Sequence, residues 1–453
     1  MATTINHPTL ISLASSSRWG AGRKGLFPDR PYWREAMSPS PHEEPLKLPA
    51  RVDVVIVGSG FTGLSAALTL ARRGRSVAVL EANSIGHGAS TRNGGQVGSG
   101  NQKFRVRDLI RLRGEKLAAE LLHEGVAMLD YIEQLVSNEK IDCHFHRYGR
   151  FRGAVRPSHY EAMARDMDDL RRLIGVESYS VPKVEQHREI GTDAFHGGSV
   201  LPKDAGLHPG LFHAGLVRSV RAAGGSVHGR TRVLAITQHN VGFSVQTEQG
   251  RIDARDVIIA TNGYTRNLIG YLDRRIVPVQ SAIIATDDLP APLLDSMMPT
   301  RRMYGNTNRA FSYFRAAPAE NRMLWGGRVG RLAAAGSGAA FAHLAADLLR
   351  VFPQAAAAKV THGWVGNIGY TFDDLPHLGR TPDGVYFAMG YCGTGVSRST
   401  FFGNKIALKL LGDRAGATPF DQIAMRTHAF HFLAKPAVPI VETAYRLRDH
   451  FDL

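Results

Sequence analysis

The chain has 453 residues, of which 43% are hydrophobic and 21% charged, and its formal net charge at pH 7 is +15. This length allows two or three domains with a sizeable core, and the composition is that of a globular protein. No apolar run reaches the roughly 18 residues of a membrane helix, and the basic residues are scattered without a dense Lys/Arg block. An anionic cofactor or substrate explains the charge as well as nucleic acid does, and we expect neither a membrane nor a nucleic-acid partner.

The first 47 residues are predicted to form an irregular lead-in. Residues 1–28 lack Asp and Glu and carry three basic residues, which we interpret as a basic arm rather than a transit peptide. Prolines are frequent from residue 28 onward. The chain has only two cysteines, Cys143 and Cys392, without a CxxC pair, so we expect no disulfide framework and a reducing, cytoplasmic compartment. His144 and His146 alone do not make a metal site, and no metal is expected.

A βαβ unit follows the lead-in. Residues 52–58 are a continuous apolar run, typical of a strand buried on both faces, and a helical pattern after them ends at Gly74. Residues 76–82 form the second buried strand. Such a unit is the usual framework of a nucleotide-binding site.

The turn of this unit carries the pattern G-x-G-x-x-G. Gly58 permits the tight turn, Gly60 lets the backbone approach a pyrophosphate, and Gly63 allows close packing of helix on strand. Glu81 closes the second strand, where a carboxylate accepts hydrogen bonds from both ribose hydroxyls. The pattern in this context predicts a dinucleotide site.

The next segment, residues 87–100, is a loop with the sequence HGASTRNGGQVGSG. An NAD enzyme would continue directly into further βα units, whereas the small residues here let backbone amides lie against a flat ring or a phosphate. Arg92 is predicted to point at cofactor or substrate. The alternative is an ordinary connecting loop.

The remaining elements fall into blocks of different character. Between helical patterns at 107–135 and 160–174, the stretch RYGRFRGAV alternates as an exposed edge strand would. A helix at 208–225, strands up to about 263, a strand-rich segment at 276–330 and an amphipathic surface helix at 332–349 follow. A last buried strand ends in glycines before a helix at 396–411.

These blocks predict a discontinuous cofactor domain with a second domain inserted. The cofactor domain comprises 48–104, 196–272 and 355–420, and the second domain comprises 105–195 and 273–354. Residues 421–453 form a C-terminal extension.

Several motifs carry a family resemblance. VVIVGSGFTGLSAALTLARRGRSVAVLEA and GASTRNGGQ resemble the FAD-dependent D-amino-acid oxidase superfamily, in particular its γ-glutamylputrescine oxidoreductase-like branch. Four further motifs of this superfamily follow in the expected order: RVLAI, VIIATNGYT, YFRAAPAENRMLWGGR and GYTFDDLPHLGRTPDGVYFAMGYCGTGV. The resemblance covers about residues 30–450. It implies an α/β fold with a Rossmann-like, glutathione-reductase-type FAD domain, an inserted α+β substrate domain, and the active site between them.

The resemblance also implies which residues bind FAD. They are Gly58, Gly60, Phe61, Thr62, Gly63, Glu81, Ala82, Gly88, Ala89, Ser90, Arg92, Asn93, Gly94, Gly95, Gln96, Val233, Thr261, Asn262, Gly263, Gly390, Tyr391, Gly393, Thr394 and Gly395.

The implied chemistry is two-electron oxidation at a C–N bond. Hydride passes from the carbon next to nitrogen to flavin N5, and the imine hydrolyses to an aldehyde or keto compound and an amine. The amides and dipole of the helix after Gly395 would stabilise the reduced flavin. The electron acceptor is O2, or a carrier in a dehydrogenase. A flavoprotein with a structural, nucleic-acid-associated role is the remaining alternative. The sequence does not predict an oligomeric state.

One position discriminates among substrates. Sarcosine oxidases place a flavin-bonded cysteine three residues before the Thr of the YT pair, and glycine oxidases place a carboxylate-binding arginine there. This chain has Ile368, so the resemblance implies non-covalent FAD and disfavours simple α-amino acids. An amine or an N-substituted amino acid is favoured, with any anion held elsewhere.

Two further sets of candidates remain open. Those for holding a substrate anion are Arg92, Arg309, Arg315 and Arg328, each of which could equally be a paired structural arginine. Those for catalysis are Tyr264, Tyr370 and Tyr391, placed over the flavin, and His377, placed near its ring edge. Each of these four could equally be a packing residue.

Overall fold

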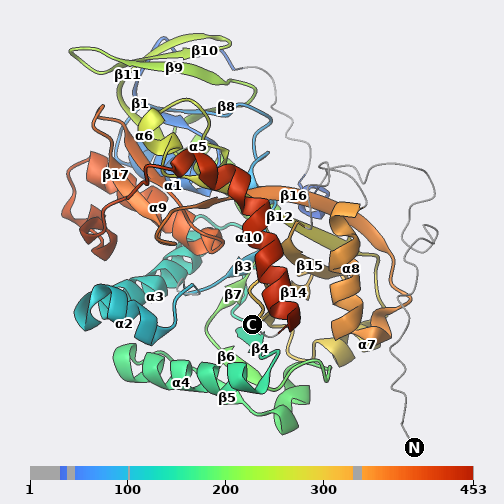
Figure 1. Ribbon diagram of the computed structural model, residues 1–453. Helices are drawn as coiled ribbons and strands as arrows, with labels where there is room; N and C mark the ends of the chain where they lie inside the picture. Colours follow the sequence, from blue (N-terminus) through green and yellow to red (C-terminus); the bar gives the residue numbers. More distant parts are fainter. Residues whose placement is uncertain (1–30, 38–45, 100–102, 330–338, 452–453) are drawn as a thin grey trace, which may run out of the picture.

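The computed structural model describes residues 31–37, 46–99, 103–329 and 339–451. Two eight-stranded sheets dominate this part of the chain, and a two-stranded sheet of β3 (Gln96–Val97) and β7 (Ala205–Gly206) lies with them. Figure 1 shows β1 and β11 in one half of the molecule and β12 to β16 in the other. The mixed α/β fold predicted from the sequence is therefore confirmed.

The first sheet contains the predicted βαβ unit. Its strands are, in order, β17 (His377–Arg380), β18 (Tyr386–Met389), β11 (Gly250–Ile259), β1 (Arg51–Val57), β2 (Val77–Leu80) and β8 (Ser226–His228), while β10 (Phe243–Thr247) joins β11 to β9 (Val233–Gln238). β1 pairs in parallel with both β11 and β2, and its side chains alternate between two core clusters on opposite faces of the sheet, which explains its apolar run.

Helices cover one face of this sheet. They are α1 (Phe61–Arg72), α3 (Glu115–Asn138), α5 (Pro209–Ala222) and α9 (Gly395–Leu410). α1 and α9 approach closely at Gly403, where a Cβ would lie 2.3 Å from the carbonyl oxygen of Thr62. The first residues of both helices line the same cavity.

The second sheet forms the other half of the molecule. Its strands are, in order, β16 (Val360–Tyr370), β12 (Val277–Thr286), β15 (Met323–Arg328), β14 (Tyr313–Ala316), β13 (Met303–Asn306), β4 (Arg150–Gly153), β6 (Gly198–Leu201) and β5 (Tyr179–Val181). Its core includes residues of α7 (Ala291–Met297) and α8 (Ala339–Val351). α4 (Pro157–Ile174) packs on β5 and β6 of this sheet, whereas α2 (Val106–Arg113) packs on α3 in the core of the first sheet, and α6 (Gly270–Asp273) also lies beside the first sheet.

Some local expectations differ from the structure. β4 is an interior strand rather than an exposed edge, because it pairs with β13 and β6. The arginine at position 150 does not indicate a solvent-exposed face of the strand, since Arg150 is mostly buried and its Nε lies 3.3 Å from Asp204 Oδ2. The single helix expected at 107–135 is two helices, broken at Gly114, whose φ is +79°.

The expected block boundaries also differ. β6 and β16 fall within the blocks predicted for the cofactor domain, yet both hydrogen-bond in the second sheet. Their apolar runs do not reveal which sheet they join. Of the helix expected at 332–349, residues 332–338 lie outside the described residues, and α8 begins at Ala339.

The two ends of the chain pack more than expected. In the lead-in, Tyr32–Arg34 forms a 3-10 turn (η1), and Trp33 is fully buried. In the C-terminal extension, α10 (His431–Phe451) packs against β12 of the second sheet (Figure 1). Asp449 accepts hydrogen bonds from the amides of Arg309 and Ala310 at 3.0 and 2.8 Å, which fixes the end of this helix on the second domain. None of the described helices is long and apolar enough to span a bilayer.

His208 makes the stability of this fold sensitive to acid. Its Nδ1 accepts the amide of Leu211 at 3.1 Å and so caps α5, and burial lowers its pKa to about 4, helped by the charge of His144. Because the unfolded chain takes up the proton near pH 6.5 and the folded chain only near 4, stability falls as pH drops through this window, by about 3 kcal/mol from this residue. We expect His208→Asn, which retains a capping oxygen, to show a shallower fall in denaturation experiments between pH 7 and 4. Denaturation curves for His208→Asn that run parallel to those of the wild type would contradict the assignment.

Candidate active site

The glycine-rich turn between β1 and α1 has the expected geometry. Gly58 adopts φ of +107°, a conformation that L side chains rarely adopt. A Cβ on Gly63 would lie 2.0 Å from the carbonyl oxygen of Gly58, so only glycine permits this helix to meet this strand. The amide of Phe61 donates to Ser90 Oγ at 2.9 Å, which ties the start of α1 to the glycine-rich loop, residues 87–100.

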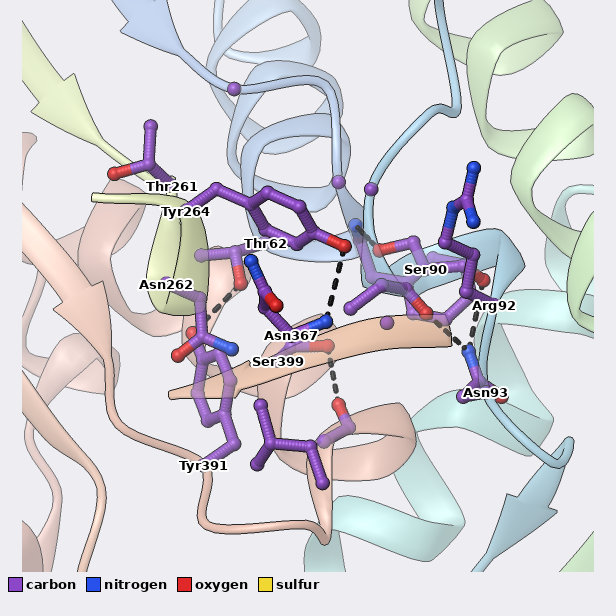
Figure 2. Close-up of a pocket in the computed structure, with 18 of the residues that line it drawn as sticks. Thr62, Ser90, Arg92, Asn93, Thr261, Asn262, Tyr264, Asn367, Tyr391 and Ser399 are labelled. Carbon is purple, nitrogen blue, oxygen red and sulfur yellow. Dashed lines mark hydrogen bonds between the residues drawn. The ribbon is translucent and has the colours of Figure 1, made fainter. Parts of the chain in front are cut away.

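A cavity of about 510 Å³ opens beside this turn and extends toward the second sheet. Its volume is typical of small-molecule and cofactor sites. The predicted cofactor residues that line it are Gly58, Gly60, Phe61, Thr62, Glu81, Ala82, Gly88, Ala89, Ser90, Arg92, Asn93, Gly94, Gln96, Val233, Thr261, Asn262, Tyr391, Gly393, Thr394 and Gly395. Figure 2 shows how these segments converge.

Four predicted cofactor glycines lie outside the lining and serve packing instead. They are Gly63, Gly95, Gly263 and Gly390. Gly95, for example, has φ of +67°, and a Cβ there would lie 2.3 Å from the carbonyl oxygen of Leu207. These glycines allow backbone segments to meet, so their effect on a ligand is indirect.

Glu81 lies at the cavity wall as expected but already has protein partners. Its Oε2 accepts from the amide and hydroxyl of Ser59 at 3.2 and 2.9 Å, and its Oε1 accepts from the amide of Asn83 at 3.0 Å. A carboxylate oxygen has two lone pairs, so Oε1 can accept one further hydrogen bond from a ligand hydroxyl, whereas Oε2 already accepts two.

The carbonyls of the glycine-rich loop are held by donors from the protein. At least seven of them accept hydrogen bonds from side chains, namely those of His87 (from Arg92), Ala89 and Ser90 (both from Asn93), Arg92 (from Trp364), Asn93 (from Trp33), Gly95 (from Arg315) and Gly98 (from Ser397). Carbonyl oxygens turned into such contacts do not repel an electron-rich ligand. The loop is therefore a built wall of the cavity rather than a plain connector.

Arg92 lines the cavity, but its guanidinium contacts backbone. Nε donates to the carbonyl of His87 at 2.7 Å, and Nη1 donates to that of Val365 at 2.9 Å. The side chain is 6% exposed. These bonds tie the loop to β16, so the described contacts of Arg92 are structural, in contrast to the predicted direction toward cofactor or substrate.

Arg328 stands out among the arginines at the substrate end. It lies at the end of β15 and lines the cavity, and its Nη2 donates to the hydroxyl of Tyr370 at 2.7 Å. Its Nη1 is buried and has no hydrogen-bond partner among the described residues. A guanidinium group with a buried, unused donor atom at a cavity wall fits an anionic ligand group.

The other two arginine candidates do not reach this cavity. Arg315 is fully buried, with Nη1 donating to the carbonyls of Gly95 and Leu207 at 2.9 and 3.0 Å, so it supports the loop from behind. Arg309 lies exposed in the loop held by Asp449. Their patterns in sequence were indistinguishable from that of Arg328, because strand-end arginines can face either side.

The catalytic candidates separate by what their polar atoms contact. Tyr391 is buried, and its hydroxyl lies 2.7 Å from Thr62 Oγ1 and donates to the carbonyl of Ala388 at 3.0 Å, so it is used in packing α1 on the last strand. His377 does not line the cavity and pairs with Asp373 at 3.0 Å. Tyr264 and Tyr370 do line it. Figure 2 shows the hydroxyl of Tyr264 directed at Asn367, whose amide donates to it at 3.2 Å.

Sequence reasoning missed several residues of the cavity lining, from both halves of the molecule. The missed residues include Arg150, Arg232, Arg266, Ser281, Phe311, Tyr313, Asn367 and Ser399. The pairing of β12 with β16 and β15 brings Ser281 and Asn367 to the cavity, whereas Arg232 and Arg266 lie in loops and Ser399 lies on α9. Burial raises the pKa of Tyr313 to about 12, so its hydroxyl, 3.0 Å from Ser281 Oγ, stays neutral at ordinary pH.

The charged residues that line the cavity favour an anionic ligand. Among the described lining residues, Arg92, Arg150, Arg232, Arg266 and Arg328 stand against one carboxylate, Glu81. A turn that only glycine permits, helix N-termini and this positive lining together fit a dinucleotide with its pyrophosphate.

Comparison with known proteins agrees with this site. The family model described as FAD dependent oxidoreductase, DAO, matches residues 53–408. The chain is 30% identical to γ-glutamylputrescine oxidoreductase of Escherichia coli (strain K12) over 406 residues, covering 88% of this chain and 92% of that protein. It is also 30% identical to the probable oxidoreductase OrdL of Haemophilus influenzae over 399 residues, covering 86% and 90%.

Solved structures share the fold. The crystal structure of glycine oxidase from Geobacillus kaustophilus superposes with a TM-score of 0.68 at 24% identity, and the match covers 84% of this chain and all of that one. The family match takes in most of the chain, including both sides of the cavity, and it confirms the resemblance noted in the sequence. The protein is a member of the DAO family of FAD-dependent oxidoreductases.

Proposed function

We propose that this enzyme oxidises the C–N bond of an amine or N-substituted amino acid that carries an anionic group away from the reacting carbon. Two features of the cavity lining carry the proposal together. Arg328 has a buried Nη1 without a hydrogen-bond partner among the described residues, and Ile368 is an apolar residue of the same lining. An arginine fork binds carboxylate or phosphate well, and an isoleucine cannot.

The cofactor would lie along the residues that line the cavity from the β1–α1 turn to the start of α9. When bound, FAD supplies the acceptor for two electrons and a proton equivalent removed from the substrate carbon. The amides at the start of α9, after Gly393 and Thr394, would face the electron-rich ring. Both lie in the lining.

Non-covalent binding of FAD is part of the proposal. Ile368 offers no nucleophile, and neither Cys143 nor Cys392 is among the lining residues. Both thiols are buried and free, and burial raises the pKa of Cys392 to about 11, so little thiolate forms at neutral pH. Two buried free thiols also support our placement of the protein in a reducing compartment.

Tyr370 would orient the substrate together with Arg328. Arg328 donates to the Tyr370 oxygen, so the hydroxyl hydrogen is available to a substrate acceptor. The ring of Tyr370 also lies under Lys103 Nζ, at 4.5 Å from its centroid. These contacts hold the phenol in place at the mouth of the substrate end.

Relatives support amine chemistry. The names of two of them state action on γ-glutamylputrescine and on glycine. γ-Glutamylputrescine carries a carboxylate remote from an amine, which matches the remote anionic group that Arg328 would bind. Arginine at position 368 would be expected for a glycine-like substrate, and this chain lacks it.

Turnover assays test the proposal. We expect an acid-bearing amine, such as a γ-glutamyl amine, to yield a carbonyl product far faster than glycine or a simple polyamine. Acid precipitation should leave the yellow FAD in the supernatant. Peroxide formed per product distinguishes O2 from an electron carrier as the final acceptor. Turnover of glycine faster than of every acid-bearing amine would contradict the proposal.

A further inference from the structure

The N-terminal segment 31–37 precedes residues 53–408, which the family model matches, and yet it packs behind the glycine-rich loop that lines the cavity. Trp33 is fully buried, and its ring centroid lies 4.8 Å from that of His208 and 5.1 Å from that of Tyr32. It shares a core cluster with Trp364 of β16 and packs near Tyr313, a cavity residue. The segment is thus built into the wall behind the glycine-rich loop.

Two indoles hold neighbouring carbonyls of this loop. Trp33 Nε1 donates to the carbonyl of Asn93 at 2.7 Å, and Trp364 Nε1 donates to that of Arg92 at 3.0 Å. Both tryptophans are fully buried, so the two bonds are shielded from water.

The hydrogen bonds from the two indoles to these carbonyls also fix the direction of the neighbouring backbone N–H groups. In a trans peptide the C=O and the N–H point in opposite directions, and the described chain has no cis peptide bond. Holding the carbonyls of Arg92 and Asn93 on the indole side therefore turns the amides of Asn93 and Gly94 to the other side. Asn93 and Gly94 both line the cavity.

We propose that Trp33 is a positioning residue, which fixes the Asn93–Gly94 peptide so that its N–H is presented to the electron-rich ring of the cofactor. The inference rests on the proposed place of FAD in this cavity. A donor aimed at the ring stabilises its reduced, more negative form. The N-terminal segment, although it precedes residues 53–408 of the family-model match, then takes part in the function of the active site.

Replacement of Trp33 by phenylalanine tests the proposal. This variant keeps an aromatic ring and removes the N–H donor. We expect FAD to bind about fivefold to tenfold more weakly, as the loss of one hydrogen bond predicts, and the flavin midpoint potential to become more negative. Hydrogen exchange of the amides at 92–95 should be faster.

Trp325→Phe is the matched control. Trp325 is also fully buried, but its Nε1 has no hydrogen-bond partner within the part of the chain that the structure describes. We expect this control to lose stability while retaining wild-type exchange at 92–95 and a wild-type midpoint potential. Should Trp33→Phe fail to fold, a benzothienylalanine at position 33, which has the shape of tryptophan but no N–H, replaces it.

The outcomes separate this proposal from the proposed function. Equal exchange rates and equal potentials in the Trp33 variant and the control would overturn the role of Trp33. Absence of product from every amine, with the Trp33 effects on FAD binding and potential present, would overturn the proposed substrate and leave the role of Trp33 standing.

Discussion

Gly63→Ala is expected to give a protein that does not retain FAD and that unfolds well below the wild-type temperature. The new Cβ would lie 2.0 Å from the carbonyl oxygen of Gly58 and 3.2 Å from the side chain of Ile56. The contact is with backbone on one side and a buried strand on the other, so neither can yield without separating α1 from β1. FAD content of the purified protein and its melting temperature measure the effect.

Gly74→Ala provides the control for this prediction. Gly74 follows the same helix, has φ of +72°, and would place its Cβ with nothing within 4 Å. It should lose only about 1 kcal/mol, the strain of a left-handed alanine, and keep its FAD. A Gly63→Ala protein that stays yellow and as stable as Gly74→Ala would show that the helix and strand are not packed as described.

Arg328→Met is expected to lower kcat/KM for an acid-bearing amine by about 100-fold, because the buried anion of the substrate would lose its charged partner. Most of the loss should appear in KM if the anion is bound equally in ground and transition states. Arg328→Lys should recover only part of the activity, since lysine keeps the charge but not the fork. An amine of similar length without the acid should react at nearly the same rate with wild type and variant.

Arg309→Met is the control for the loss of a positive charge. Arg309 is exposed and outside the cavity lining, so its replacement should leave kcat/KM unchanged. If Arg328→Met impaired acid-bearing and acid-free amines equally, Arg328 would be supporting Tyr370 or the sheet rather than binding a substrate anion.

The sequence was most informative where function depends on local geometry. Gly58, Gly60 and Gly63 are specified by a turn of six residues, so their pattern predicted both the βαβ unit and its close packing. The membership of the family followed from motifs of the same kind. Ile368 could be assigned to the substrate wall because its place in a motif fixes its register on β16.

It was least informative where a residue's role depends on pairing between distant strands. Arg315 and Arg328 both lie on strands of the second sheet, yet one turns behind the loop and the other into the cavity. Burial of Trp33 depends on β16 and on a loop 60 residues away, neither of which constrains the local pattern PYWRE. For the same reason Arg150, on a strand that resembled an exposed edge, was not recognised as a cavity residue.

The most direct test of the account is anaerobic mixing of the purified FAD protein with two amines of matched length, one ending in a carboxylate and one ending in a methyl group. The absorbance of oxidised flavin near 450 nm is followed by stopped flow. The account predicts rapid bleaching by the acid-bearing amine and a rate lower by about 100-fold for the other at subsaturating concentration. Bleaching at the same rate by both amines, or by neither while FAD is bound, would contradict it.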